Sequence, residues 1–242
     1  MIENLDRYLI GVALGIRFRA NFTIEDQLGK IVDTILYSSK SYFNPTIFPK
    51  VRNLIGKKVL FNEISQDTLQ IDNSNIILEL NFGDEFSFRQ KDLDNILRNF
   101  NEQIINGIMK EFSIKEIVRI GYIRRYIFNL KDLAETFVNK TVGDTLEGVN
   151  DINLSFSKRI PLSASLTKSD VNDYDNAIFN VIKKADMEEI FMSVDYQSFF
   201  DPFLPSSGLV EFKPFIEKAN GFNSNKYLTW LNSNYVEVEN VK

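Results

Sequence analysis

The chain has 242 residues, of which 44% are hydrophobic and 13% aromatic, enough to fill the core of one large domain or two small ones. It contains no cysteine and no histidine, which excludes disulfides, thiol nucleophiles, histidine-based catalytic triads and conventional zinc hydrolases. The formal net charge of -5 gives no global attraction to nucleic acid or to anionic membranes, so any such role has to be local.

The first part of the chain predicts a strand followed by a helix. Apolar residues from Ile10 to Phe22 alternate with small or polar ones, which is the period of a strand with one buried face. The next stretch, "TIEDQLGKIVDTILY", places apolar residues at helical spacing after a capping-box start at Thr23. The run "YLIGVALGI" at residues 8–16 is too short to span a bilayer, and no signal-peptide cleavage site follows it. We therefore expect a cytoplasmic protein without membrane contact.

A meander and a second helix are predicted next. Residues 41–57 hold two prolines and little periodicity, which favours a loop. Three short strands follow, "KVLFNEI", "DTLQID" and "NIILELNF", separated by turn-rich pairs as in an antiparallel meander. Residues 91–112 then carry apolar side chains on one face of a helix.

The second part of the chain contains the same kinds of element. We expect a strand at 117–128, a short capped helix at "DLAETFVNK" and three strands at "DINLSFSKRI", "NAIFNVIKK" and "EIFMSVDYQ". Helical turns are expected around 214–218 and 226–231. Because strands and helices are segregated, the predicted fold class is α+β, with mainly antiparallel sheets and helices packed on one face. We expect a single domain over residues 1–242, in which two similar-sized halves would divide near residue 130.

The segment "RIGYIRRYIFN", residues 119–129, sets three arginines among tyrosines and aliphatic residues in a mildly acidic chain. As a strand it is apolar on both faces, which is typical of the centre of a sheet that is covered on both sides. An arginine is retained in such a place only where a carboxylate or carbonyl groups satisfy it. Glu79, in a strand expected nearby, is one candidate partner.

A second interpretation makes these arginines a binding surface. Arg17 and Arg19 lie on the face of the first strand that points away from the core. If this strand pairs with the arginine segment, Arg119 and Arg125 join them in a row of guanidinium groups, with Tyr122 nearby. Such a row suits phosphate or single-stranded nucleic acid. The competing interpretation is a set of solvated or ion-paired arginines, which is the commoner outcome.

Three stretches carry a family resemblance: "GVALGIRFRANF" near the start, "RIGYIRRYIFNL" followed by "KDLAETF" in the middle, and "MSVDYQSFF" followed by a helical tail. Over nearly its whole length the chain resembles an uncharacterised, sporadically distributed family of prokaryotic proteins of similar length. Arg119, Gly121, Arg125 and Tyr126 match the polar anchors of the family pattern, with an isoleucine inserted in the first pair. The resemblance implies mobile or defence-linked genes, and no activity is carried over from it.

A metal-dependent nuclease is the second alternative. Asp201, Glu211 and Lys213, in "DPFLPSSGLVEFK", have the spacing of an acid followed by Glu-x-Lys. Carboxylates of this kind hold magnesium while the lysine steadies an attacking water. The chemistry requires Glu211 and Lys213 on a strand, whereas the apolar spacing at 209–216 is also compatible with a helix.

The stretch "YQSFFDPFLP" concentrates aromatic residues beside two prolines. If exposed, these side chains would form an interface with a partner or a second copy, because Phe and Tyr anchor interface cores. The alternative is that they fill the core beneath a loop. The candidate interface residues are Tyr196, Phe199, Phe200 and Phe203.

No glycine-rich phosphate loop and no pair of acids on well-defined elements is present. These absences favour a non-enzymatic interaction or regulatory module over an enzyme. We expect its partner to be another protein or a second copy in a homodimer, and we expect no cofactor and no metal. The alternatives are the phosphate- or nucleic-acid-binding module built on the arginines, and the nuclease.

Overall fold

The computed structural model describes residues 2–37, 43–83, 86–114, 116–129, 131–142, 151–161, 173–184, 187–205 and 211–235. Its centre is one nine-stranded sheet in the order β2-β3-β4-β5-β1-β6-β9-β8-β7, in which every neighbouring pair is antiparallel. The strands are β1 (Leu9–Phe18), β2 (Lys50–Leu54), β3 (Lys57–Phe61), β4 (Thr68–Asp72), β5 (Asn75–Asn81), β6 (Glu116–Phe128), β7 (Ile152–Pro161), β8 (Tyr174–Lys183) and β9 (Ile190–Pro205). This confirms the predicted α+β class with mainly antiparallel strands.

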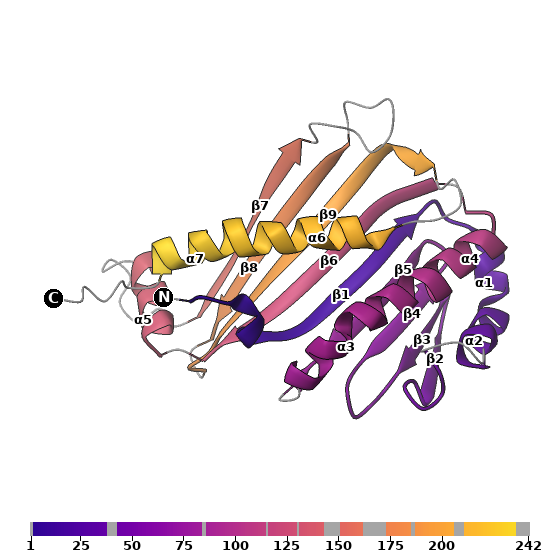
Figure 1. The fold of residues 1–242 in the computed structure, drawn as a ribbon, viewed down its shortest axis with the longest axis horizontal. Helices are drawn as coiled ribbons and strands as arrows, with labels where there is room; N and C mark the ends of the chain where they lie inside the picture. The colour runs from indigo at the N-terminus through magenta and orange to yellow at the C-terminus, as the bar shows by residue number, and fades with distance from the viewer. Residues whose placement is uncertain are drawn as a thin grey trace.

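Two long helices cross the sheet on one face (Figure 1). The first long helix is α3 (Phe86–Asn99), η3 (Phe100–Ile105) and α4 (Asn106–Glu111), and the second is α6 (Phe212–Phe222), η4 (Asn223–Tyr227) and α7 (Leu228–Tyr235). Both η3 and η4 are π-helical turns within a continuous helix. The shorter helices are η1 (Leu5–Tyr8), α1 (Phe22–Asp26), α2 (Leu28–Tyr37) and α5 (Lys131–Val142). No helix in the described part of the chain is both long and apolar enough to cross a bilayer.

The predicted alternation in the first strand holds in the structure. Val12, Leu14, Ile16 and Phe18 are buried against the helices, while the residues between them point to the other face. One expectation was wrong, because the predicted loop at 41–57 contains the edge strand β2. Every residue of β2 is exposed, so burial left no periodic pattern in its sequence.

The arginine segment forms β6, which lies between β1 and β9 at the centre of the sheet. Its helix-facing residues are buried, including Tyr122 and Arg124, whereas those on the other face are half-buried. The expectation that both faces are covered was therefore wrong for the described residues, whose helices pack on one face only (Figure 1). We call the other face the open face.

The order of elements occurs twice along the chain. A strand, short helices, a meander and a long helix run from β1 to α4, and a similar series runs from β6 to α7. The first strands of the two series, β1 and β6, are paired side by side, with Leu14 opposite Tyr122. The sheet thus runs uninterrupted from one series into the other, while the predicted division near residue 130 stays a prediction.

Candidate functional site

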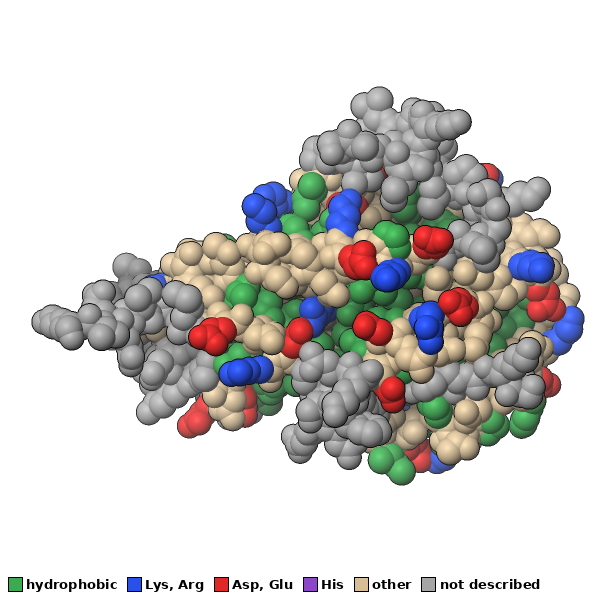
Figure 2. All heavy atoms as spheres, in the orientation of Figure 1, with side chains coloured by type: hydrophobic (Ala, Val, Ile, Leu, Met, Phe, Trp, Pro, Cys, Tyr) green, Lys and Arg blue, Asp and Glu red, His purple; other side chains and the backbone are tan. Residues whose placement is uncertain are grey.

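A groove of about 850 Å³ lies between the two long helices, and we call it the helix groove. In Figure 2 hydrophobic side chains form the floor of the gap between the helices, and charged side chains of both signs line its rims. The first long helix contributes Asp94, Asn95, Leu97, Arg98, Asn101 and Glu102. The second contributes Glu211, Phe212, Lys213, Ile216, Glu217 and Asn220.

The amphipathic pattern of the two helices produces this groove. Ile96, Leu97 and Phe100 of the first long helix and Phe212 and Phe215 of the second are buried. The rings of Phe100 and Phe212 lie 6.3 Å apart, which brings the two helices together at this point. Because residues three and four positions apart share a helix face, the polar residues between these anchors line the rims.

The rims of the helix groove carry more negative than positive charge. Four lining residues are carboxylates and two are cations. Lys213 lies 3.9 Å from Glu217, but both side chains are mostly exposed, so this pair neutralises the excess only weakly. The groove therefore favours a positively charged ligand.

Arg124 of β6 contacts Asn220, a residue that lines the helix groove. Its guanidinium donates to Asn220 Oδ1 at 3.1 Å and to the carboxylate of Asp6. Burial by itself lowers the pKa of Arg124, but Tyr126, Tyr122 and Asp6 raise it above its ordinary value, so the side chain stays charged. Its Nε has no hydrogen-bond partner among the described residues, nor has Oδ1 of Asn101 on the groove wall.

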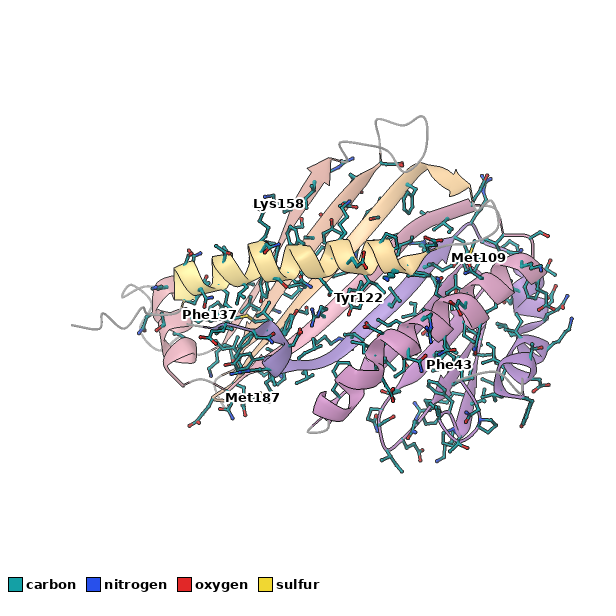
Figure 3. All side chains as sticks on the ribbon, in the orientation of Figure 1. Phe43, Met109, Tyr122, Phe137, Lys158 and Met187 are labelled. Atoms are coloured by element: carbon teal, nitrogen blue, oxygen red, sulfur yellow. The ribbon has the colours of Figure 1, made fainter. Side chains whose placement is uncertain are left out.

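Two tyrosines flank Arg124 on β6. Tyr122 lies beneath the gap between the two long helices (Figure 3). Burial raises the pKa of Tyr122 to about 12, although the charge of Arg124 opposes the shift. Burial raises the pKa of Tyr126 in the same direction. Both phenols therefore remain protonated near neutral pH and serve as packing groups, and the hydroxyl of Tyr126 has no hydrogen-bond partner among the described residues.

The N-terminal residues 2–8 lie alongside the second long helix at the end of this gap (Figure 1). The side chain of Asn232 in α7 makes two hydrogen bonds with the backbone of Ile2. Its Oδ1 accepts from the Ile2 N–H at 2.9 Å, and its Nδ2 donates to the Ile2 carbonyl at 2.8 Å. Ile2 and Leu5 are buried, and Tyr8 stacks on Phe128 with ring centroids 4.7 Å apart. The space beside the second helix therefore accepts a short chain segment through its backbone and its apolar side chains.

Three of the arginines singled out in the sequence, Arg17, Arg119 and Arg125, lie on the open face. Arg17 is directly opposite Arg119, and Arg125 Nη2 lies 3.2 Å from Glu79 Oε1, which confirms the predicted partner for this arginine. Arg19 pairs with Glu116 at 3.1 Å near the end of the strand. The structure thus brings together Arg17 and Arg119 only, because Arg125 lies six positions further along β6 and both Arg125 and Arg19 are ion-paired.

Tyr122 does not join this row. It points to the helix-covered face of β6 and is 2% exposed. Arg124, which sequence reasoning left out of the site, lies on that same face. The signal was present, because the alternation along β6 placed Arg124 with two tyrosines on one face.

The predicted aromatic interface is divided between the two faces of β9. Tyr196 and Phe200 are buried under the helices, whereas Phe199 is half-buried on the open face and stacks on Tyr174 at 4.9 Å. The side chain of Phe203 lies outside the described residues. Alternation along the strand therefore prevents the described members from forming one patch.

The nuclease alternative required Glu211 and Lys213 on a strand, whereas the structure has the helix with which the apolar spacing was also compatible. Glu211 is the N-cap residue of α6, and Lys213 lies in its first turn. The side chain of Asp201 lies outside the described residues. Within the described part of the chain, no three Asp or Glu side chains are grouped so that they would hold a metal ion.

The sequence matches no family model and none of the curated proteins. The resemblance to a sporadically distributed prokaryotic family stays a prediction.

Proposed function

We propose that the protein is a non-enzymatic interaction module that holds a segment of a partner protein in the helix groove. The observation that carries this proposal is the groove of about 850 Å³ between two helices above a sheet. Its volume lies within the range of ligand-binding clefts. Support comes from residues 2–8, which occupy the end of the same gap.

The chemistry of the groove indicates which partner segment it suits. Leu97, Phe212 and Ile216 offer apolar contacts, while the carboxylates on both rims exceed the cations. An amphipathic segment with apolar anchors and Lys or Arg side chains complements both features. The partner is therefore a basic segment of another protein.

Binding suits this site better than turnover. A general acid or base works best with a pKa near the working pH. Burial raises the pKa of Tyr122 to about 12, and it raises that of Tyr126 too, which moves both groups away from neutrality. Following the family resemblance, we place the protein in the cytoplasm of a prokaryote, encoded among mobile or defence-linked genes and acting on a regulatory partner.

A random-peptide phage library panned on the purified protein tests this function. We expect enrichment of peptides that combine Lys or Arg with large apolar residues, and the affinity of selected peptides is then measured by fluorescence anisotropy. The double variant Asp94→Lys/Glu217→Lys should weaken their binding at least tenfold, which is about 1.4 kcal/mol.

A matched control is Asp33→Lys/Glu188→Lys, which changes the net charge equally at exposed carboxylates that do not line the groove. This control should leave the affinity within about twofold of the wild type. The proposal fails if no basic peptide is enriched, or if both double variants bind the selected peptides equally well.

A further inference from the structure

We infer that the open face of the sheet is a second binding site, for single-stranded nucleic acid. One register row crosses all nine strands of this face, from Arg52 on β2 through Gly15 and Gly121 at the centre to Arg159 on β7. With neighbouring strands about 4.8 Å apart, such a row spans close to 40 Å. The face is thus wide enough for several nucleotides.

The open face is basic although the chain is acidic. Its described strand positions hold five arginines, two lysines and four carboxylates, a formal charge of +3 within a chain of net charge -5. The arginines are Arg17, Arg52, Arg119, Arg125 and Arg159, and the lysines are Lys50 and Lys57. The carboxylates are Asp72, Glu79, Glu116 and Asp195. Positive charge is thus concentrated on the open face, while the rest of the molecule carries the excess of negative charge. Such a local positive surface gives an acidic protein the attraction that it needs to bind a polyanion.

Two central arginines of this face lack a salt bridge in the described structure. Arg17 is directly opposite Arg119 on the paired strands β1 and β6. Like charges placed opposite each other destabilise a sheet. No carboxylate lies within salt-bridge distance of either residue in the described part of the chain, whereas Arg125 is paired with Glu79. A ligand phosphate between Arg17 and Arg119 would relieve the repulsion and accept hydrogen bonds from both guanidinium groups.

A hollow of about 80 Å³ lies beside this pair, where Gly15 and Gly121 face each other. A Cβ atom on Gly15 would lie 2.8 Å from the carbonyl oxygen of Ile76, so the backbone requires glycine there. A Cβ atom on Gly121 would have Cγ of Gln197 as its nearest neighbour, at 3.8 Å, which is an ordinary van der Waals contact. The packing of the sheet therefore does not require glycine at position 121, and its missing side chain leaves room for a ligand next to Arg119.

Two stacked aromatic rings lie between two guanidinium groups on the open face. Arg119 lies over the ring of Phe199 at 5.8 Å, Phe199 stacks on Tyr174, and Arg159 lies over Tyr174 at 3.6 Å. Surfaces that bind single strands combine basic groups for the backbone with aromatic rings on which bases stack. This combination favours a single strand over a lipid headgroup or a phosphorylated peptide, which offers no base for the rings.

Fluorescence anisotropy with a mixed-sequence single-stranded oligonucleotide, as DNA and as RNA, at several salt concentrations tests the inference. Two engaged phosphates give a slope of about -1.4 in a plot of the logarithm of affinity against that of salt. The double variant Arg17→Ser/Arg119→Ser should lose at least tenfold in affinity and flatten this slope. The matched control Arg98→Ser/Lys213→Ser removes the same charge from the helix groove and should change affinity less than twofold.

Two further variants probe the hollow and its charge. Gly121→Val should weaken oligonucleotide binding by filling the hollow while the thermal unfolding curve stays close to that of the wild type. Asp195→Asn should tighten binding, because it removes a negative charge beside Arg119. The inference is overturned if the wild type does not bind the oligonucleotides at low salt, or if both double variants lose affinity equally. It is also overturned if a duplex of the same length binds as tightly, or if vesicles containing phosphatidylserine bind while the oligonucleotides do not.

Discussion

The guanidinium group of Arg124, on the central strand β6, is paired with the carboxylate of Asp6, 118 positions away in the chain. The Arg124 side chain is 8% exposed, so its charge is almost wholly removed from water. The two described residues that accept its hydrogen bonds, Asp6 and Asn220, belong to η1 and to α6. Arg124 thus ties the N-terminal segment and the second long helix to the middle of the sheet.

Removing the carboxylate of Asp6 should destabilise the protein. In Asp6→Asn the buried guanidinium group of Arg124 keeps only an uncharged, weaker partner. Because the Asp6 side chain is 35% exposed, water compensates part of the loss, and we expect the free energy of unfolding to fall by about 2 kcal/mol. Urea denaturation measures the loss. Glu3→Gln, at an exposed position of the same segment, is the control and should be neutral.

The double variant Asp6→Asn/Arg124→Met separates the ion pair from the packing around it. Because the buried charge is gone, its free energy of unfolding should lie closer to the wild type than that of Asp6→Asn. A value for Asp6→Asn within about 0.5 kcal/mol of the wild type would show that the pair does not hold the segment.

Asp175 should be the most sensitive carboxylate of the described part of the chain. It is fully buried, accepts hydrogen bonds from Tyr196 at 2.7 Å and Ser198 at 2.5 Å, and pairs with Lys218 of α6. Asp175→Ala leaves these donors without an acceptor and should cost about 3 kcal/mol or more in the free energy of unfolding. Lys218→Met removes a half-exposed partner and should cost about 1 kcal/mol. Equal losses in the two variants, measured by urea denaturation, would contradict this assignment.

The glycines of the two central strands should respond differently to the same substitution. Gly15→Ala places a Cβ 2.8 Å from a backbone oxygen and should cost about 1 to 3 kcal/mol in the free energy of unfolding. Gly121→Ala meets only ordinary contacts and should be neutral or stabilising by up to about 1 kcal/mol. Thermal unfolding of the two variants side by side provides the measurement, and a larger loss at position 121 would refute the difference.

Asp195 should make stability depend on pH. Burial raises its pKa above the ordinary value of 3.8, although Gln197 and Arg119 oppose the shift. The stability that comes from its protonated form is therefore fully present below pH 3.8 and is lost as the pH rises through the pKa in the folded protein. Asp195→Asn stays neutral and escapes this loss, so its free energy of unfolding relative to the wild type should increase from acidic to neutral pH. Urea denaturation across this range measures the difference, and a constant difference would argue against burial as the cause.

The sequence predicted those parts of the fold in which burial imposes a period. The alternation in β1 and β6 and the meander of β3 to β5 were visible because one face of each strand packs against helices. The edge strand β2 was missed because neither of its faces is buried. The two helical stretches near the end of the chain form one continuous helix, because the π-helical turn η4 joins them.

The candidate site was harder to predict because its parts are distant in the chain. The groove is formed by two helices that begin at Phe86 and Phe212, and their relative position follows from the sheet beneath them. The pairing of Arg124 with Asp6 joins a central strand to a short helix that precedes the first strand. No local pattern encodes such contacts, whereas Glu79 was predicted as a partner of an arginine because its strand was expected to lie nearby.

The repeated order of elements makes the chain equivalent to a tethered dimer. Without the other series, either β1 or β6 would present an unpaired strand edge, and each covers the edge of the other. The covalent link fixes the ratio of the two series at one to one and allows their residues to differ. Each wall of the helix groove carries two carboxylates and one cation, but at different spacing: Asp94, Arg98 and Glu102 on one side, and Glu211, Lys213 and Glu217 on the other. A symmetric dimer would offer a bound segment two equivalent orientations, whereas the different spacing of the charges on these two walls distinguishes its N-terminal from its C-terminal direction.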